Sequence, residues 1–140
     1  MTHIQIIMGK KEDYKQKNEE FMARMRQAEG IRTLPMGVLY EVIRSGEGTE
    51  KVEPSSVVTI HYIGGLISGK AFDNSRTRQC PAAFRVKDLI PGFQVALCQM
   101  KPGDFWRIYI PSEAGYGKRT NGPIPGNSAL IFEVELLSIA

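Results

Sequence analysis

Five aromatic rings and one carboxylate are the side chains whose types and spacing suggest chemistry in this chain. They belong to Tyr62, Phe72, Asp73, Phe93, Tyr116 and Phe132. Each ring taken alone is most simply a core residue, except Tyr116, which lies in the polar segment GYGK where a ring has little local reason to be. Asp73 occupies the turn-like segment FDNSR, where a short carboxylate can bond the backbone. Arg78 lies close enough in sequence to pair with that carboxylate.

The groups that usually carry covalent or proton-transfer chemistry lack suitable neighbours. His3 and His61 are the two histidines, and neither has the context of a catalytic dyad or triad. His61 lies between two inward positions of an alternating segment, so we expect its ring to face solvent. Cys80 and Cys98 lack metal-type spacing, and we expect two free thiols. No glycine-rich segment joins a strand to a helix as a phosphate loop does. We therefore expect neither a metal nor a cofactor.

The composition indicates one globular domain with a sizeable core. The chain has 140 residues, of which 42% are hydrophobic and 24% charged, and its net charge is only +3. There is no basic block that would indicate nucleic acid and no apolar stretch long enough to span a membrane. The N-terminus lacks a signal-peptide pattern. We expect a cytoplasmic protein, with a mature exported chain as the alternative.

A helix is predicted over residues 10–29, which contain no proline or glycine and are rich in helix formers. Gly30 suits the C-terminal end of this helix. Tyr14, Phe21 and Met25 fall near one face. Three interpretations remain open: a helix that packs on its own domain, one that offers this face to a second copy or an unfolded client, and a frayed tail. Because the helix carries none of the candidate residues, we expect their chemistry to survive deletion of residues 1–30.

Alternation of apolar and polar residues predicts a set of strands in the rest of the chain. The predicted strands span 37–46, 57–63, 83–86, 104–110 and 129–139. Ser68-Gly69 is typical of a hairpin turn, and Pro91 opens a short helix predicted over 91–100. The simplest packing is an α+β fold, in which an antiparallel sheet lays its apolar face across this helix.

Four segments, taken together in order and spacing, resemble the FKBP family of peptidyl-prolyl cis-trans isomerases. They are VTIHYIGGLISGKAFDNSR, VKDLIPGFQVALCQM, PSEAGYGKR and PIPGNSALIFEVELL. The resemblance covers 35–140 and leaves 1–34 as an N-terminal helical extension. It implies a curved antiparallel half-barrel wrapped around one short helix. It also implies an isomerase without cofactor or metal that acts on X-Pro segments of folding proteins, with macrolide immunosuppressants as further ligands.

The resemblance also implies roles for individual residues. The implied catalytic set is Tyr62, Asp73, Tyr116 and Phe132. The implied substrate-binding residues are Phe72, Arg78, Leu89, Ile90, Phe93 and Ile124. The Ile90 backbone N–H would bond a ligand carbonyl, and the Tyr116 hydroxyl would bond the substrate. Phe93 stands where the family usually has tryptophan, and Ala82 stands where it has phenylalanine. These departures slightly favour an alternative function, a prolyl-peptide-binding chaperone or adaptor with little turnover.

The segment EGIRTLPMGVLYEVIRSGEG, with the helix before it, resembles the bacterial subgroup that includes the macrophage infectivity potentiator proteins. Members of that subgroup carry an N-terminal helical dimerisation region, and many are exported. The resemblance therefore implies a homodimer through the N-terminal helix. It also implies a periplasmic or cell-envelope location as the alternative to the cytoplasm.

Overall fold

The structure, a computed structural model, describes residues 3–140, with side-chain surroundings from residue 9 onward. Its elements are α1 (His3–Arg26), β1 (Arg32–Thr33), the 3₁₀ turn η1 (Pro35–Gly37), β2 (Leu39–Arg44), β3 (Val57–Leu66), β4 (Ala71–Asn74), β5 (Ala82–Arg85), η2 (Val86–Asp88), α2 (Pro91–Leu97), β6 (Phe105–Ile110), η3 (Ser112–Ala114) and β7 (Leu130–Ile139). The strands form one antiparallel sheet in the order β1-β2-β6-β7-β3-β4. β5 pairs with the other half of the β3 edge that β4 occupies.

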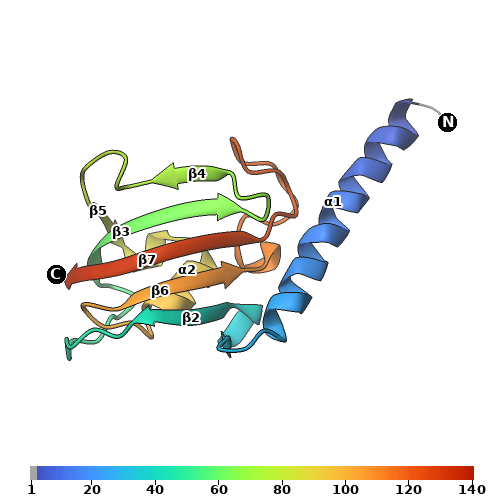
Figure 1. Ribbon diagram of the computed structural model, residues 1–140. Helices are drawn as coiled ribbons and strands as arrows, with labels where there is room; N and C mark the ends of the chain where they lie inside the picture. Colours follow the sequence, from blue (N-terminus) through green and yellow to red (C-terminus); the bar gives the residue numbers. More distant parts are fainter. Residues whose placement is uncertain (1–2) are drawn as a thin grey trace.

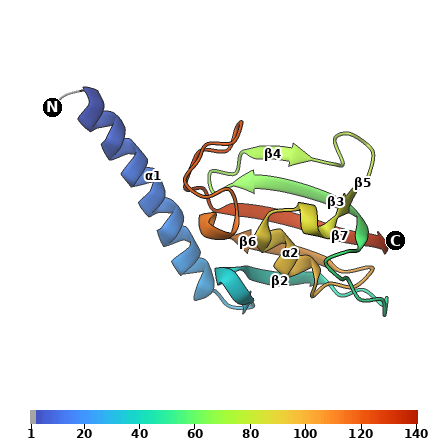
Figure 2. The same cartoon turned by 180° about the vertical axis from the view of Figure 1, so that it is seen from behind.

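The sheet curves around α2, which lies against its concave face (Figures 1 and 2). Alternate residues of the long strands point toward this helix and are buried. These residues include Val58 and Ile60 on β3, Trp106 and Ile108 on β6, and Val134 and Leu136 on β7. The predicted α+β architecture, a curved antiparallel sheet around one short helix, is therefore confirmed.

A glycine allows α2 to lie close to β6. A Cβ atom at Gly92 would lie 2.5 Å from Ile110 Cγ2 and 3.0 Å from the carbonyl oxygen of Ala114, so no larger residue fits there without displacing the helix. The helix ends at Leu97 rather than at the predicted position 100. The chain continues through tighter turns, in which the N–H of Met100 donates to the carbonyl of Leu97 over 3.0 Å.

The predicted strands are confirmed to within two residues at each end, except for β3. β3 continues to Leu66 because Gly64 and Gly65 still pair with Phe132 and Ile131 of β7. Because these glycines interrupt the alternation of apolar and polar residues, the pattern did not predict this extension. The short strand β1 was also not predicted, because two residues are too few to show an alternating pattern. The predicted hairpin turn is confirmed, with Gly69 at a φ of 91°.

Helix α1 packs on the opposite face of the sheet, beside the end where β6 ends and β7 begins (Figure 1). The residues of this outer cluster are Phe21, Met22 and Met25 of α1, with Ile31, Leu39, Ile67, Tyr109, Ala129 and Ile131 of the domain. The interpretation that the helix packs on its own domain is confirmed. The expectation that Phe21 and Met25 offer an exposed apolar face is wrong, because both are partly buried against the sheet.

The predicted bounds of this helix, 10–29, are also wrong. It begins at His3 and ends at Arg26, and it tolerates Gly9 in its interior, where an added Cβ would meet nothing within 4 Å. The chain then turns, and Gly30 adopts the left-handed conformation with a φ of 82°, which favours glycine after a helix.

Shortening the central residue of the outer cluster should loosen α1. Met22 is 7% exposed, and we expect Met22→Ala to lower the free energy of unfolding by about 2 kcal/mol, the low end for a buried methionine, because the cluster is small. Denaturant titration measures this, with Lys17→Ala on the exposed side of the helix as the control. Equal unfolding midpoints for the two variants would contradict the packing role of Met22.

Candidate functional site

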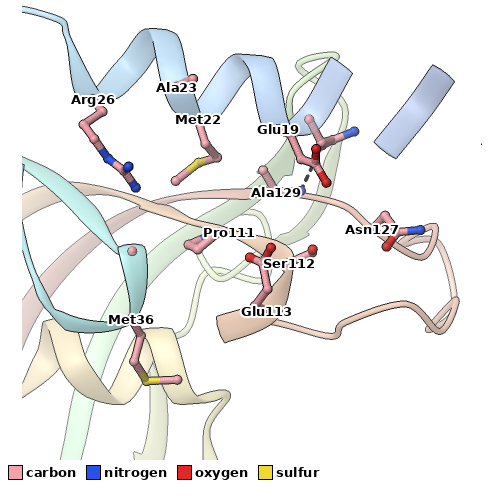
Figure 3. A pocket seen from close by; sticks show the side chains of 12 residues that line it. Glu19, Met22, Ala23, Arg26, Met36, Pro111, Ser112, Glu113, Asn127 and Ala129 are labelled. Atoms are coloured by element: carbon pink, nitrogen blue, oxygen red, sulfur yellow. Dashed lines mark hydrogen bonds between the residues drawn. The ribbon is translucent and has the colours of Figure 1, made fainter. Parts of the chain in front are cut away.

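One hollow on the concave side of the sheet gathers most of the predicted site residues. It encloses about 270 Å³ and is lined by Tyr62, Phe72, Asp73, Phe84, Asp88, Leu89, Ile90, Phe93, Tyr116 and Phe132. Two other cavities, of about 340 and 330 Å³, lie along α1 and contain none of the predicted residues; Figure 3 shows the former. The candidate site is therefore the smaller hollow, where the aromatic rings meet a carboxylate.

Three buried rings from three different elements form the base of the hollow. Tyr62 comes from β3, Phe132 from the adjacent β7, and Phe93 from α2, and they are 6%, 4% and 4% exposed. The ring centroids of Phe93 and Phe132 are 4.8 Å apart, and Tyr62 lies 6.4 Å from Phe132 and 6.5 Å from Phe93. These separations are typical of aromatic side chains in contact. The arrangement leaves an apolar surface suited to a small aliphatic ring.

Gly64 makes room for the aromatic side wall of the hollow. Phe72 of β4 packs edge-on against Phe132, with ring centroids 5.7 Å apart. A Cβ at Gly64 would lie 2.7 Å from Phe132 Cε1 and 2.8 Å from Phe72 Cε1. No role for Gly64 was predicted from the sequence, although its place directly after His61-Tyr62-Ile63 was a visible signal.

Asp73 lies at the edge of the hollow, between a tyrosine and an arginine. The Tyr62 hydroxyl donates to Asp73 Oδ2, and Arg78 forms an ion pair with Oδ1. Burial raises the pKa of the Asp73 carboxyl, but hydrogen bonds from Tyr62 and Arg78 outweigh burial and hold this pKa below its ordinary value. Burial and the hydrogen bond to Asp73 raise the pKa of Tyr62. The predicted pairing of Arg78 with Asp73 is confirmed.

The turn after Asp73 is capped mainly by its neighbour. Asn74 Oδ1 accepts hydrogen bonds from the backbone N–H groups of Arg76 and Thr77, over 3.0 and 3.2 Å. Asp73 accepts one local bond, from the N–H of Asn74, over 2.9 Å. The carboxylate of Asp73 therefore remains available to hold the Tyr62 hydroxyl.

The rim of the hollow comes from the segment before α2 and from the loop after η3. Leu89 and Ile90 line one side, and Tyr116, which is 38% exposed, lines the other. Gln94 Nε2 donates to the Leu89 carbonyl over 2.6 Å and so holds this segment in place. Within the described residues, no backbone or side-chain oxygen accepts the N–H of Ile90. That donor is available at the rim.

Two residues of the hollow were missed from the sequence. Phe84 of β5 packs against Tyr62 with ring centroids 5.8 Å apart. It lies on the same strand as Ala82, where the family usually has a phenylalanine. The alternation along β5 was the available signal. Asp88 adds a second carboxylate, so the expectation of a single carboxylate is wrong. The turn η2, which sequence alternation does not reveal, brings Asp88 to the rim.

Two predicted residues lie outside the lining. Arg78 contacts the site by its ion pair with Asp73, and its Cζ lies 5.9 Å from the centroid of the Tyr62 ring. Ile124 is 5% exposed and belongs to the main core, not to the wall of the hollow. The solvent-facing prediction for His61 is wrong, because its ring is half-buried and its Nδ1 lies 3.0 Å from Ser75 Oγ. The side chain of His3 falls outside the described surroundings. Cys80 and Cys98 are free, as predicted.

Comparison with known proteins decides the family. The family model described as FKBP-type peptidyl-prolyl cis-trans isomerase matches residues 48–137. The chain belongs to this family. The FKBP resemblance predicted from the four sequence segments is therefore confirmed.

Two curated relatives align with most of this FKBP chain. The peptidyl-prolyl cis-trans isomerase Mip of Coxiella burnetii is 40% identical over 125 residues, which are 89% of this chain and 54% of that protein. The outer membrane protein MIP of Legionella longbeachae is 38% identical over 131 residues, which are 93% of this chain and 56% of that protein. The chain thus spans about half the length of these curated relatives.

One solved structure has a fold similar to that of this chain over almost the whole length of both. The peptidyl-prolyl cis-trans isomerase of Pseudomonas syringae is 33% identical, with a TM-score of 0.85, and the match covers 92% of this chain and 95% of that one. Because the sheet and its central helix make up less than 92% of the chain, the similarity extends into the N-terminal helix.

A methyl group at Gly64 should disturb the hollow without unfolding the chain. We expect Gly64→Ala to displace Phe72, the more exposed of the two rings, at a stability cost of about 1–3 kcal/mol, and to weaken binding of a prolyl peptide several-fold. Isothermal titration with such a peptide measures the loss. Gly65→Ala is the matched control, because its Cβ would meet neither ring; its nearest neighbours would be the Lys70 carbonyl oxygen, at 3.3 Å, and the Ala71 Cα, at 3.8 Å. Unchanged affinity for Gly64→Ala would show that this wall does not contact the peptide.

Proposed function

We propose that this chain catalyses cis-trans isomerisation of X-Pro peptide bonds in folding proteins. The observation that carries the proposal is the hollow itself, in which buried Tyr62, Phe93 and Phe132 surround an apolar space beside the held carboxylate of Asp73. Family membership and the names of the relatives support the same activity.

The reaction fits a site without a titrating base. Rotation about the amide is opposed by resonance, with a barrier of roughly 18–20 kcal/mol. Resonance places negative charge on the carbonyl oxygen, where water stabilises it. An apolar hollow withdraws this water, weakens the planar amide and can bind the twisted form better than the planar form. No bond is broken, so neither a nucleophile nor a proton acceptor is required.

The residues of the hollow have distinct parts in this mechanism. Phe93 and Phe132 would grip the proline ring, while Tyr62 is fixed against them by its hydrogen bond to Asp73. The available N–H of Ile90 would hold the peptide on one rim by donating to a carbonyl. The hydroxyl of Tyr116 would orient the peptide from the other rim. An acceleration of about a hundredfold needs about 2.7 kcal/mol, which desolvation and one or two hydrogen bonds can supply.

A binding module with little turnover is the second candidate. Phe93 lacks the indole N–H of the usual tryptophan, and Ala82 leaves one rim without a ring. Phe84, on the same strand as Ala82, places its ring beside Tyr62 and offsets part of the aromatic surface that Ala82 does not supply. Turnover of an X-Pro peptide measured by NMR exchange separates the two, because a module of this kind would bind the peptide without accelerating exchange.

Two finer proposals concern ligands and assembly. The aromatic hollow supports binding of macrolide immunosuppressants, which competition against a prolyl peptide would test. Within residues 9–26, a homodimer through α1 would have to use the side of the helix turned away from the sheet. Over these residues that side is mainly charged and exposed, as at Lys17 and Glu20, because Phe21, Met22 and Met25 already pack on the sheet. Sedimentation of the protein would determine its oligomeric state.

We propose a periplasmic or cell-envelope location in preference to the cytoplasm. The support is that the Legionella longbeachae relative is named an outer membrane protein. Within residues 3–140, no helix has the length and apolar character needed to cross a bilayer. Fractionation of cells that express the natural gene would test the location.

Removing the carboxylate of Asp73 should impair catalysis more than folding. We expect Asp73→Ala to lower kcat/KM about tenfold or more, because Tyr62 loses the acceptor that fixes its hydroxyl. Protease-coupled turnover and denaturant unfolding measure the two effects separately. Asn74→Ala is the control, since it removes the cap of the same turn without touching Tyr62. If Asp73→Ala unfolds the chain but leaves turnover per folded molecule unchanged, Asp73 is a turn residue only.

Turnover should not depend on a group that titrates near neutral pH. The pKa of Asp73 lies below its ordinary value and that of Tyr62 above it, so neither changes charge between about pH 6 and pH 8. We expect a nearly flat kcat/KM profile over this range. A limb near the reference pKa of histidine, about 6.5, that disappears in His61→Ala would contradict the mechanism.

A further inference from the structure

Two side chains of α1 hold one end of the loop that carries Tyr116, here called the Tyr116 loop (115–129). Asn18 is 3% exposed, and its Oδ1 accepts the backbone N–H of Ala129 over 2.9 Å, the bond dashed in Figure 3. Its Nδ2 donates to the carbonyl of Tyr14 over 2.8 Å. The side chain is therefore oriented by its own helix and bonded to the point where the loop enters β7.

The second anchor is the hydroxyl of Tyr14. It lies 2.6 Å from Ser128 Oγ, and Ser128 Oγ in turn lies 2.6 Å from the carbonyl oxygen of Pro125. A carbonyl can only accept, so the single hydroxyl hydrogen of Ser128 goes to Pro125, and Tyr14 must donate to Ser128. The chain of bonds thus runs from α1 through Ser128 into the loop.

The two limbs of the loop are close enough for this anchor to reach Tyr116. The N–H of Asn127 donates to the carbonyl of Gly117 over 2.8 Å, one residue after Tyr116. A Cβ at Gly126 would lie only 2.1 Å from the carbonyl oxygen of Lys118, so the limbs touch through their backbones. A shift of the anchored limb must therefore displace the limb that carries Tyr116.

The contact between α1 and the loop is narrow. One cavity beside it is lined by Asn18, Asn127 and Ala129, and the other is lined by Tyr14, Gly126 and Asn127 (Figure 3 shows the first). With open space on both sides, the segment 125–128 is held to α1 by these hydrogen bonds, while Ala129 at its end packs in the outer cluster. The position of this segment relative to α1 therefore depends on these bonds.

We propose that Tyr14 and Asn18 are positioning residues for prolyl isomerisation, because they fix the Tyr116 loop at the rim of the hollow. This inference rests on the proposed function. It also reverses the expectation, formed from the sequence, that residues 1–30 are dispensable for turnover of short peptides. Neither residue touches the hollow, so both act through the loop.

The test compares, in the full chain, variants that remove the hydrogen bonds between α1 and the loop with a variant that weakens the packing of α1 on the sheet. We expect Tyr14→Phe, which removes one hydroxyl, to lower kcat several-fold, and the double variant with Asn18→Ala to lower it about tenfold, with a smaller change in KM. The amide hydrogen of Asn127 should exchange about tenfold faster in the double variant, because the limb it secures is released. Met25→Ala is the control, since Met25 packs in the outer cluster but forms no hydrogen bond to the loop.

The outcomes separate positioning from stability. If Met25→Ala reduces the melting temperature as much as the double variant while its turnover stays normal, the loop anchor is supported. Turnover of the double variant equal to that of the unaltered chain would overturn the proposal, as would an equal loss of turnover in Met25→Ala. If the unaltered chain shows no turnover, the proposed function fails, and Asn127 exchange in Tyr14→Phe alone decides whether α1 holds the loop.

Discussion

The register between β3 and β7 is the constraint on which the site depends. Tyr62 lies opposite Val134, and Gly64 lies opposite Phe132. Because side chains alternate across a sheet, a slip of one residue would send one of the two rings to the outer face. The buried positions on the concave side, Ile60 and Leu136 among them, oppose such a slip by the apolar area they would lose. The core thus fixes the positions of the two rings independently of the polar contacts around them.

Polar contacts then act on a scaffold that is already set. Asp73 sits on the short edge strand β4, which is paired with β3 on one side and bends at a bulge near Gly64 and Gly65. An edge position lets the carboxylate reach Tyr62 while Arg78 approaches from solvent. Surface ion pairs of this kind contribute little to stability. The role of this one is better understood as holding the Tyr62 hydroxyl in one direction.

The sequence predicted the concave face well because alternation reports burial directly. Val58, Ile60 and Tyr62 repeat at every second position, and the structure buries all three. The outer cluster was harder to predict, since Tyr109 is out of phase with Ile108 and Ile110 and becomes buried only when α1 covers it. Most residues indicated by the family motifs line the hollow, whereas Ile124 lies in the main core, into which its loop folds back. No local pattern marks Asn18, because its partner lies 111 residues away.

The energetics explain why a remote helix can matter to such a site. Amide rotation needs only a few kcal/mol of differential binding for a large acceleration, because about 1.4 kcal/mol corresponds to a tenfold rate change. Each group that touches the peptide then supplies a substantial share of the total. Tyr116 is exposed on a loop with glycine or proline at 115, 117, 122, 123, 125 and 126, and the loop side chains that pack inside the protein, Ile124, Ser128 and Ala129, lie in its other limb. Part of the order that catalysis needs at this rim therefore comes from contacts to that limb, and α1 supplies two of them through buried Asn18 and part-buried Tyr14.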